Sequence, residues 1–406
     1  MIINFYVQNF GSIKDRQTLS FEADKSKHLE DYYVFQVNEN LRLLKMALIY
    51  GSNASGKTMI LRALQFLKEL VLLPLEKKTE PLDFEPFLFD ENTPHENTIL
   101  GIEFIQARVR YEYEVEFNQK TIIKEELYNY NPHKANVFKR TTDIEKQFSQ
   151  ITFGGKIKGN SIFKKTLEAN TLWNNTVIGG FLKTNIESKE LTDVKNWFDN
   201  YLSPLIFPET NLENAATTVA GELNSVKNTI IQILKKADFN ISDVLIKKED
   251  ADVELKFEHT IKGKQYLLPF EYESRGTKRY YMFALLLNAL ITLPVGIPID
   301  EIDSSLHPDL FEHFLITFLL NSQQSQLIAT THNREILNNR DLFRNDAIWI
   351  VDRTEECSTE LYSLVDFDTS VIRNTSNIYN AYKAGKFGGV PNLGDNYIEK
   401  ESNEKG

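Results

Sequence analysis

Apolar and polar residues alternate along several short stretches of the chain, with the two-residue period of a strand that has one buried face. The alternation is clearest in Val109–Phe117, where apolar or aromatic residues alternate with charged ones. Ile99–Ile105 precedes it, and the two segments together predict a hairpin. Ile3–Val7 and Leu19–Phe21 also alternate, and they predict two short strands around a turn at Gly11. These patterns predict an antiparallel β subdomain in the first 130 residues.

Other apolar runs are unbroken, as expected for strands that are buried on both faces of a sheet. Met46–Tyr50 is the first of these, and apolar residues at helical spacing follow it as far as Leu73. Later patterns predict strands at Val253–Phe257, Tyr266–Phe270, Gln326–Thr330, Ala347–Val351 and Leu361–Leu364, a short strand that ends at Asp300, and helices at Thr277–Leu293 and Pro308–Leu320. Strands that alternate with helices in this way predict an α/β fold with a mixed sheet core.

Between residues 131 and 245 the pattern changes. Asn, Lys and Thr are frequent there and the helical period is intermittent, which predicts a mostly helical inserted lobe. We expect four segments: a first part of the core (1–130), the inserted lobe (131–245), a second part of the core (246–375) and a C-terminal tail (376–406). A chain of 406 residues is long enough for one large core with such an insertion.

Charge and cysteine content exclude some classes of protein. A formal net charge of −11 argues against a broadly basic surface that coats nucleic acid, but it allows a local basic groove. Cys357 is the only cysteine, which excludes a disulfide framework within the chain and fits a reducing compartment. The opening residues carry no charge before their apolar stretch and so do not resemble a signal peptide. We therefore expect a cytoplasmic protein.

One apolar stretch is long enough to cross a bilayer. Tyr280–Ile299 contains no charged residue over 20 positions. Pro294, Gly296 and Pro298 interrupt its second half, so a buried helix that runs into a buried strand is the better interpretation, and no membrane is expected as a partner. Because proline has no N–H to give to a neighbouring strand, Pro298 predicts irregular pairing there.

The clearest chemistry follows the first unbroken apolar strand. Residues 51–58 fit the phosphate-binding pattern G-x-x-x-x-G-K-[ST] in full: Gly51, Ser52, Asn53, Ala54, Ser55, Gly56, Lys57 and Thr58. Glycines in such a loop let consecutive N–H groups point at a phosphate, and the helix that follows adds its positive dipole end. This P-loop predicts an ATP site in which Lys57 reaches the β- and γ-phosphates and Thr58 ligates Mg²⁺.

An acidic pair and a histidine extend this site. Asp300 ends an apolar strand, where its carboxylate can hold Mg²⁺ directly or through water, and Glu301 beside it can polarise the attacking water. His332 follows the next strand, where a neutral imidazole can sense the γ-phosphate and orient that water. We predict Glu301 and His332 as catalytic residues, and Thr58 and Asp300 as metal ligands.

Together these motifs resemble a known family. In chain order the P-loop, Ser274–Thr277, Asp300–Glu301, Ser304–Pro308 and His332 resemble the ABC ATPases and, within them, the SMC/RecF/OLD-like branch. The segment from Asn9 to Ile13 (NFGSI) also resembles the N-F-x-S-I start of that branch. The resemblance covers roughly residues 1–117 and 253–364. It implies an ABC-type ATPase head that binds ATP and Mg²⁺.

Two further segments narrow the resemblance. Glu273–Arg279 (ESRGTKR) resembles the E-S-x-G-T-[KR] segment of stand-alone bacterial ATP-binding proteins found beside restriction and phage-exclusion loci, the RloA-like group. The tail Ile378–Pro391 also resembles the corresponding segment of the RloA-like group.

The resemblance also implies a partner protomer. In ABC proteins the signature segment, which Ser274–Thr277 matches, acts on the ATP of the partner protomer, so a homodimer or higher homo-oligomer is implied. The residues expected to bind ATP in this way are Ser274, Arg275, Gly276 and Thr277. Free N–H groups at the start of the following apolar helix suit a γ-phosphate, although a plain charged turn is the simpler alternative. Ser304–Pro308 would be the D-loop at the dimer seam.

The chain departs from the ABC pattern in several places. It has no Leu-Ser-Gly-Gly-Gln sequence, which counts against a transport role. No glutamine lies in Pro86–Asn92, where the Q-loop is expected, so no residue is assigned to it. Ala54 replaces a glycine that is common in the P-loop, and we expect this to be tolerated. Arg275 is larger than the usual residue, and we hypothesise that it adds positive charge to the partner's ATP site.

The resemblance implies a nucleotide-driven switch in bacterial defence against phage, with a separate effector chain such as a nuclease. The chain itself has no credible nuclease site, because Asp366-Phe-Asp368 alone is too little. One alternative is a RecF- or SMC-like DNA-repair ATPase that binds DNA directly, for which the candidate phosphate contacts are Lys156, Lys158, Lys164 and Lys165. Another is a scaffold that binds ATP without hydrolysis, because Pro298 misplaces the acidic pair. DNA or a phage component is a further candidate partner.

Overall fold

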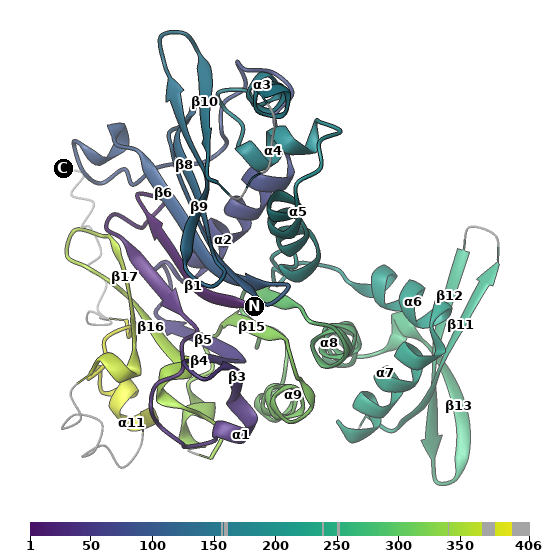
Figure 1. Ribbon diagram of the computed structural model, residues 1–406. Coiled ribbons are helices and arrows are strands. Elements are labelled where there is room, and N and C mark those ends of the chain that lie inside the picture. Colours follow the sequence, from purple (N-terminus) through teal and green to yellow (C-terminus); the bar gives the residue numbers. More distant parts are fainter. Residues whose placement is uncertain are drawn as a thin grey trace, which may run out of the picture.

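The computed structural model describes residues 1–155, 157, 161–237, 239–249, 252–339, 341–367 and 378–391. The body of the protein is built on two sheets, and helix α2 (Lys57–Leu72) contacts both of them (Figure 1). A smaller three-stranded sheet projects from one side together with two helices (Figure 1).

The first sheet is the predicted mixed core. Its strands lie in the order β14 (Gly296–Ile299), β15 (Gln326–Thr330), β5 (Met46–Gly51), β16 (Ile348–Arg353) and β17 (Thr359–Ser363). The first four strands are parallel, and β17 pairs antiparallel with β16. β14, β15 and β5 are buried along their whole length, which explains their unbroken apolar sequences. Because they are parallel, their carboxyl ends meet at one edge of the sheet.

A short segment extends this sheet beyond β14. Leu202 and Ile206 form parallel bridges with Gly296 and Ile299. The N–H of Ile206 donates to the carbonyl of Pro298 at 3.0 Å, and the N–H of Asp300 donates to that of Ile206 at 2.8 Å. The nitrogen of Pro298 thus faces this edge segment and not β15, with which β14 pairs in unbroken register. The predicted irregular pairing at Pro298 is therefore wrong.

The second sheet is the predicted antiparallel subdomain, and it is larger than the sequence pattern indicated. Its order is β10 (Phe148–Phe153), β9 (Lys134–Asp143), β8 (Ile122–Tyr130), β7 (Val109–Phe117), β6 (Thr98–Gln106), β1 (Ile2–Gln8) and β2 (Gln17–Ser20). β9 and β10 fall within the stretch that was expected to be mostly helical. β9 is rich in Lys, Asn and Thr, which are exposed or half-buried, and only short apolar parts of it such as Val137–Phe138 reach the core. A strand with so many polar residues gives a weak strand pattern.

The rest of the expected lobe divides into two groups. The helices α3 (Ser161–Asn170), α4 (Val177–Leu182) and α5 (Lys189–Asn196), with the π-helical turn η2 (Trp197–Tyr201), lie beside α2 and the second sheet (Figure 1). The helices α6 (Glu213–Glu222) and α7 (Asn224–Lys236) pack with β11 (Ile241–Glu249), β12 (Asp252–Ile261) and β13 (Lys264–Pro269) to form the projection (Figure 1). The four-segment division of the chain stays a prediction.

The predicted second half of the core has the expected helices. Helix α8 (Arg275–Thr292) joins the projection to β14, and α9 (Pro308–Asn321) packs against α8. Tyr280–Ile299 is therefore a buried helix that runs into a buried strand, as predicted. Within the described ranges, no helix is long and apolar enough to cross a membrane. The remaining elements are short: α1 (Glu30–Tyr33), β3 (Val34–Asn38), β4 (Leu41–Leu44), α11 (Ile378–Lys383) and the 3₁₀ turns η1 (Thr93–His95), η3 (Phe270–Tyr272), η4 (Glu335–Asn338), η5 (Asn345–Ala347) and η6 (Leu364–Asp366).

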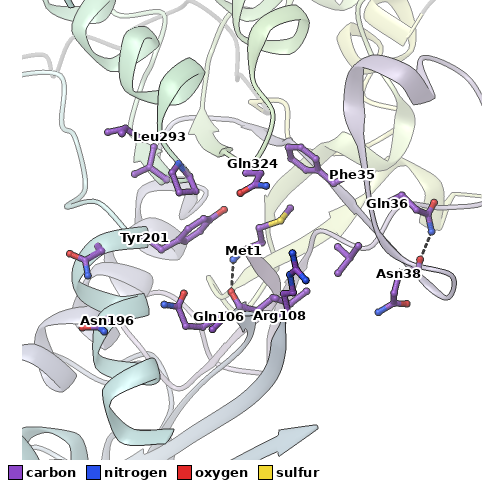
Figure 2. Close-up of a pocket in the computed structure, with 16 residues that line it drawn as sticks. Met1, Phe35, Gln36, Asn38, Gln106, Arg108, Asn196, Tyr201, Leu293 and Gln324 are labelled. Carbon is purple, nitrogen blue, oxygen red and sulfur yellow. Dashed lines mark hydrogen bonds between the residues drawn. The ribbon is translucent and has the colours of Figure 1, made fainter. Parts of the chain in front are cut away.

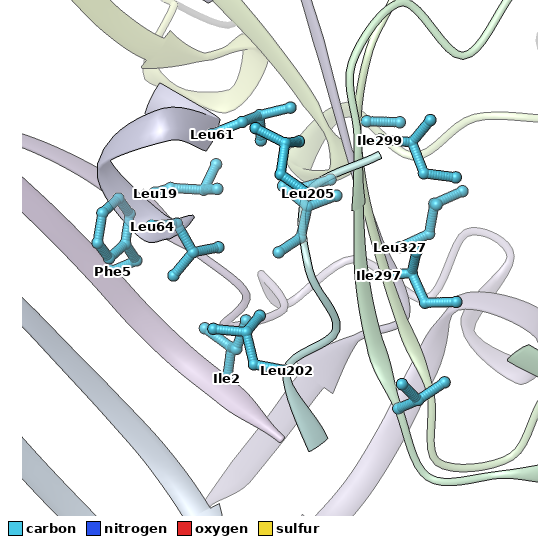
Figure 3. Close-up of a cluster of buried hydrophobic side chains, with 14 of the residues drawn as sticks. Ile2, Phe5, Leu19, Leu61, Leu64, Leu202, Leu205, Ile297, Ile299 and Leu327 are labelled. Carbon is cyan, nitrogen blue, oxygen red and sulfur yellow. The ribbon is translucent and has the colours of Figure 1, made fainter. Parts of the chain in front are cut away.

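The hydrophobic core lies where the two sheets face α2. Figure 3 shows Phe5 of the second sheet beside Leu64 of α2, with Leu205 between α2 and the core sheet. Each fully buried side chain of this size contributes roughly 1.5–3 kcal/mol. Gln326 joins the sheets by polar contacts, because its side chain accepts from Ile2 N–H at 2.6 Å and donates to the carbonyl of Ile2 at 3.0 Å. The helix that follows the P-loop is thus fixed on both sides.

Candidate nucleotide-binding site

The P-loop connects β5 to α2, as its sequence predicts. Ala54 and Gly56 both have positive φ, at 60° and 105°. A side chain at Gly56 would meet the Thr359 hydroxyl at 2.0 Å, so only glycine fits there. Ala54 adopts a left-handed conformation at a cost of about 1 kcal/mol, which a glycine would avoid. The substitution at Ala54 is therefore accommodated with some strain.

The loop is held from behind by two hydroxyl groups. Thr359, the first residue of β17, donates its hydroxyl to the carbonyl of Ser55 at 3.0 Å. The Ser12 hydroxyl lies 2.7 Å from that of Thr359, and Thr359 N–H donates to the Ser12 carbonyl at 2.8 Å. Ser12 belongs to the NFGSI segment, so the structure gives that motif a physical role in shaping the P-loop.

Lys57 lies inside the loop. Its side chain is 6% exposed, and its ammonium donates to the carbonyls of Gly51 at 3.1 Å and Ser52 at 2.9 Å. Burial lowers the pKa of Lys57 to about 8, with the nearby acidic residues opposing the shift. A polyphosphate at this position would supply the negative charge that favours the protonated amine.

The two predicted metal ligands lie together. The Thr58 hydroxyl donates to the carboxylate of Asp300 at 2.9 Å, and the Thr330 hydroxyl donates to the same carboxylate at 2.5 Å. Asp300 is 5% exposed. A hydroxyl and a carboxylate are the hard oxygen ligands that Mg²⁺ takes together with substrate phosphates. The donor set fits Mg²⁺, and the assignment of these two residues as its ligands stays a prediction.

The two predicted catalytic residues are neighbours at the same edge of the sheet. The Nε2 atom of His332 lies 3.7 Å from a carboxylate oxygen of Glu301. Glu301 has a positive φ of 46°, and its N–H donates to the Thr330 hydroxyl at 2.7 Å. A non-glycine residue in this conformation is strained and requires support from its surroundings, which Thr330 provides here.

These parts enclose a pocket of about 470 Å³. Its lining residues are Ser12, Asn53, Ala54, Gly56, Lys57, Thr58, Met59, Arg62, Glu301 and His332. The P-loop lies more than two hundred residues before Glu301 and His332 in the sequence, yet all three line one cavity. The volume is within the range of small-ligand sites.

The signature segment does not line this pocket. Ser274 caps α8, and its hydroxyl accepts from the Thr277 N–H at 3.1 Å. Ser274 and Arg275 are exposed. A side chain built at Gly276 would have as its nearest neighbours the Ser274 hydroxyl, at 3.8 Å, and the Ser305 carbonyl, at 3.9 Å. The predicted signature and D-loop are therefore neighbours, and neither of them lines the P-loop pocket.

Comparison with protein families matches residues 46–156 and 182–338 to the family described as "AAA domain, putative AbiEii toxin, Type IV TA system". The chain belongs to this family. The matched ranges contain every residue that we predict to act in the nucleotide site. No curated protein matches the chain.

Solved structures of SMC heads are similar at 14% sequence identity. The SMC head domain from Thermotoga maritima has a TM-score of 0.45, and the match covers 89% of this chain and 98% of that one. An SmcHead bound to the C-winged helix domain of ScpA has a TM-score of 0.49, with 89% and 97% covered. A head with an extended coiled coil, bound to the C-terminal domain of ScpA derived from Pyrococcus furiosus, has a TM-score of 0.46, with 95% and 98% covered. Similarity at this level carries no functional conclusion.

A cavity of this AAA domain that is larger than the P-loop pocket lies elsewhere. It measures about 1090 Å³ and is lined by residues at the amino ends of the core strands, among them Leu293, Tyr201 and Gln324 (Figure 2). Among its lining side chains only Arg108 is charged. A polyphosphate needs several cations or N–H donors, so the smaller pocket at the P-loop is the better nucleotide site despite its size.

Sequence reasoning missed three parts of the site. The Thr330 hydroxyl hydrogen-bonds to both Asp300 and Glu301, whereas the sequence predicted only that Thr330 ends a strand. Arg62 lines the pocket one turn after Thr58, and its guanidinium lies 5.7 Å from the ring centre of Phe207. Phe207 follows the edge segment beside β14 and leaves the sheet next to Asp300. The apolar run Leu205–Phe207 was the available signal, but it is too short to predict a strand.

Thr330 gives a direct test of how the acidic pair is positioned. Replacing it by valine keeps the shape but leaves the N–H of Glu301 without its acceptor. We expect the free energy of unfolding to fall by about 1–3 kcal/mol and ATP hydrolysis to slow. Thr331→Val is the matched control, since the Thr331 hydroxyl accepts from Asn333 N–H and does not contact the acidic pair. Equal hydrolysis rates for the two variants at matched folded fractions would contradict this role.

The pH dependence of kcat/KM is expected to be bell-shaped. Burial and the charge of Lys57 lower the pKa of His332 below its usual 6.5. The imidazole therefore stays neutral at pH 6.5, and the acidic limb of the profile should lie below that pH. At high pH the rate should fall as Lys57, with a pKa of about 8, loses its proton. Lys57→Arg should move the alkaline limb upward, because arginine stays protonated. An alkaline limb unchanged in Lys57→Arg would exclude Lys57 as its origin.

Proposed function

We propose that this protein is a Mg-ATP-driven switch ATPase. The observation that carries the proposal is one pocket that Lys57, Thr58 and the Glu301–His332 pair line together, with Asp300 hydrogen-bonded to Thr58. In it Lys57 would bind the β- and γ-phosphates, and Thr58 and Asp300 would hold Mg²⁺. Glu301 would polarise the attacking water, and His332 would orient it.

The second half of the site would come from another copy of the chain. Ser274 and Arg275 are exposed at the start of α8, and the segment Ser274–Thr277 lies outside the pocket, which supports action in trans on the ATP of a partner. Two copies would then enclose two ATP molecules. Arg275 is exposed and could approach the partner's γ-phosphate. Hydrolysis would reopen the dimer.

We further propose that the switch controls bacterial defence against phage through a separate effector chain, such as a nuclease. The RloA-like segment Glu273–Arg279 and the membership of the AAA domain family support this proposal. Phage plating on host cells tests it. Cells in which Glu301→Gln replaces the natural copy should plate phage as well as cells that lack the protein. Full protection by this variant would show that hydrolysis is not needed for defence.

The alternative of direct DNA binding rests on four candidate lysines, two of which lie in the described part of the chain. Lys164 and Lys165 lie on α3, and the ammonium of Lys164 lies 5.5 Å from the ring centre of Phe153. Lys156 and Lys158 lie outside the described residues. Salt-sensitive binding of duplex DNA by the purified protein would favour this alternative, and no binding at low salt would exclude it.

The structure removes the argument for a scaffold that binds ATP without hydrolysis. It rested on displacement of the acidic pair by Pro298, whereas β14 pairs regularly with β15 and Asp300 contacts Thr58. Multiple-turnover release of phosphate that disappears in Glu301→Gln would exclude it.

A further inference from the structure

The segment Ile378–Pro391 packs behind the nucleotide pocket, although it lies outside the ranges matched to the AAA family. It begins with α11 and continues through a glycine-rich turn. Ala381, Tyr382 and Phe387 are buried in the core. None of these residues lines the ATP pocket, so a direct role in catalysis is excluded, and their contacts lead to the backbone of the P-loop.

Tyr382 contacts the residue that precedes the P-loop. Its ring packs edge-on against the ring of Tyr50, with centroids 5.9 Å apart. Its hydroxyl donates to the carbonyl of Gly389 at 2.8 Å. One side chain of the tail therefore contacts both the end of β5 and the glycine turn.

Gly389 makes the closest approach. It has a positive φ of 64°, and a side chain built on it would lie 2.7 Å from Ile350, 3.3 Å from the carbonyl of Val351 and 3.4 Å from the Cα atom of Gly51. The backbone of the tail thus lies directly against β16 and the first residue of the P-loop. No side chain fits between them without a displacement.

The same segment also reaches the histidine side of the site. Helix α11 packs against η4, which begins three residues after His332. Burial raises the pKa of Tyr382 to about 12, and the positive charge of Arg334 opposes that rise. The tail therefore contacts both the start of the P-loop and the turn η4 that follows His332.

We propose that Ile378–Pro391 is a positioning element of the ATP site, in which Gly389 and Tyr382 fix the start of the P-loop from behind. This inference rests on the proposed ATP binding. The first residue of a P-loop sets the direction in which the following N–H groups point, so a small shift of Gly51 reduces phosphate binding. By linkage, a factor that displaces the tail would weaken ATP binding, and ATP would oppose that displacement.

Two matched glycines provide the test. Gly389→Ala and Gly385→Ala both place alanine at positive φ, 64° and 72°, so both should lower the melting temperature. A side chain at Gly385 would meet only Val390, at 3.2 Å, and would not touch the P-loop. ATP affinity, measured well below both melting temperatures, should fall about tenfold in Gly389→Ala and stay within about twofold of wild type in Gly385→Ala.

A second pair keeps the test valid if Gly389→Ala fails to fold. Tyr382→Phe removes the hydroxyl that donates to Gly389, and Tyr362→Phe removes one that donates to the carbonyl of Phe387 at 2.7 Å. Only the first should weaken ATP binding. Equal ATP affinities within both pairs would overturn the inference. A wild-type protein that binds no ATP would instead refute the proposed function, so the two failures are distinguishable.

Discussion

Replacing Glu301 by glutamine is expected to lower the rate of ATP hydrolysis by about 10²–10³-fold and to leave ATP binding intact. General-base assistance contributes about 10²–10⁴-fold in enzymes, and glutamine has the same shape but cannot take a proton. The carboxylate of Glu301 lies beside His332, whereas the residues predicted to bind phosphate are Lys57 and its loop. Phosphate release and ATP affinity measured on the same preparation separate the two effects.

Glu335→Gln is the control for this substitution. Glu335 is an exposed carboxylate three residues after His332 that does not line the pocket. The Glu335→Gln protein should hydrolyse ATP at the wild-type rate. A Glu301→Gln protein that keeps more than about a tenth of the wild-type rate would mean that another group activates the water.

The second large effect is complementation between two inactive chains. Lys57→Ala removes the phosphate-binding amine, and Ser274→Arg blocks the signature, so each variant alone should be nearly inactive. An equal mixture should recover about a quarter of the wild-type activity, because half of the dimers are mixed and each of these has one intact site. This recovery follows from the position of Ser274 outside the pocket that contains Lys57.

A site built within one chain gives the opposite result. In that case every chain in the mixture carries a damaged site, and the mixture stays as inactive as its components. Ser225→Arg mixed with Lys57→Ala is a control for arginine substitution in the projection, since Ser225 is an exposed residue of α7. The Ser225→Arg protein alone should be active.

The P-loop, the acidic pair and the histidine could be predicted because each follows a strand whose apolar sequence is unbroken. Burial of β5, β14 and β15 on both faces produces that pattern, and parallel pairing then brings their ends together. The antiparallel strand β7 was equally visible, because its apolar and aromatic residues alternate with charged ones. Patterns of this kind involve residues that are close in the chain, so one sequence is enough to detect them.

Other features depend on contacts between distant segments and could not be predicted in this way. The role of Thr330 depends on hydrogen bonds to Asp300 and Glu301, which are about thirty residues away in the sequence. Pro298 was expected to disturb its strand, but the side on which its nitrogen faces is set by the edge segment at Leu202–Ile206. β9 was missed because most of its residues are polar and solvent-facing. In each case tertiary context decides the outcome.

The most direct test of the ATP-driven switch is the mass in solution of Glu301→Gln with and without Mg-ATP. We predict that Mg-ATP converts a monomer of 47.0 kDa into a dimer of twice that mass, and that adding Ser274→Arg to the same chain prevents the change. A mass that does not respond to Mg-ATP would contradict the ATP-sandwiched dimer. If that constant mass is already a large assembly, ATP must act within a standing oligomer.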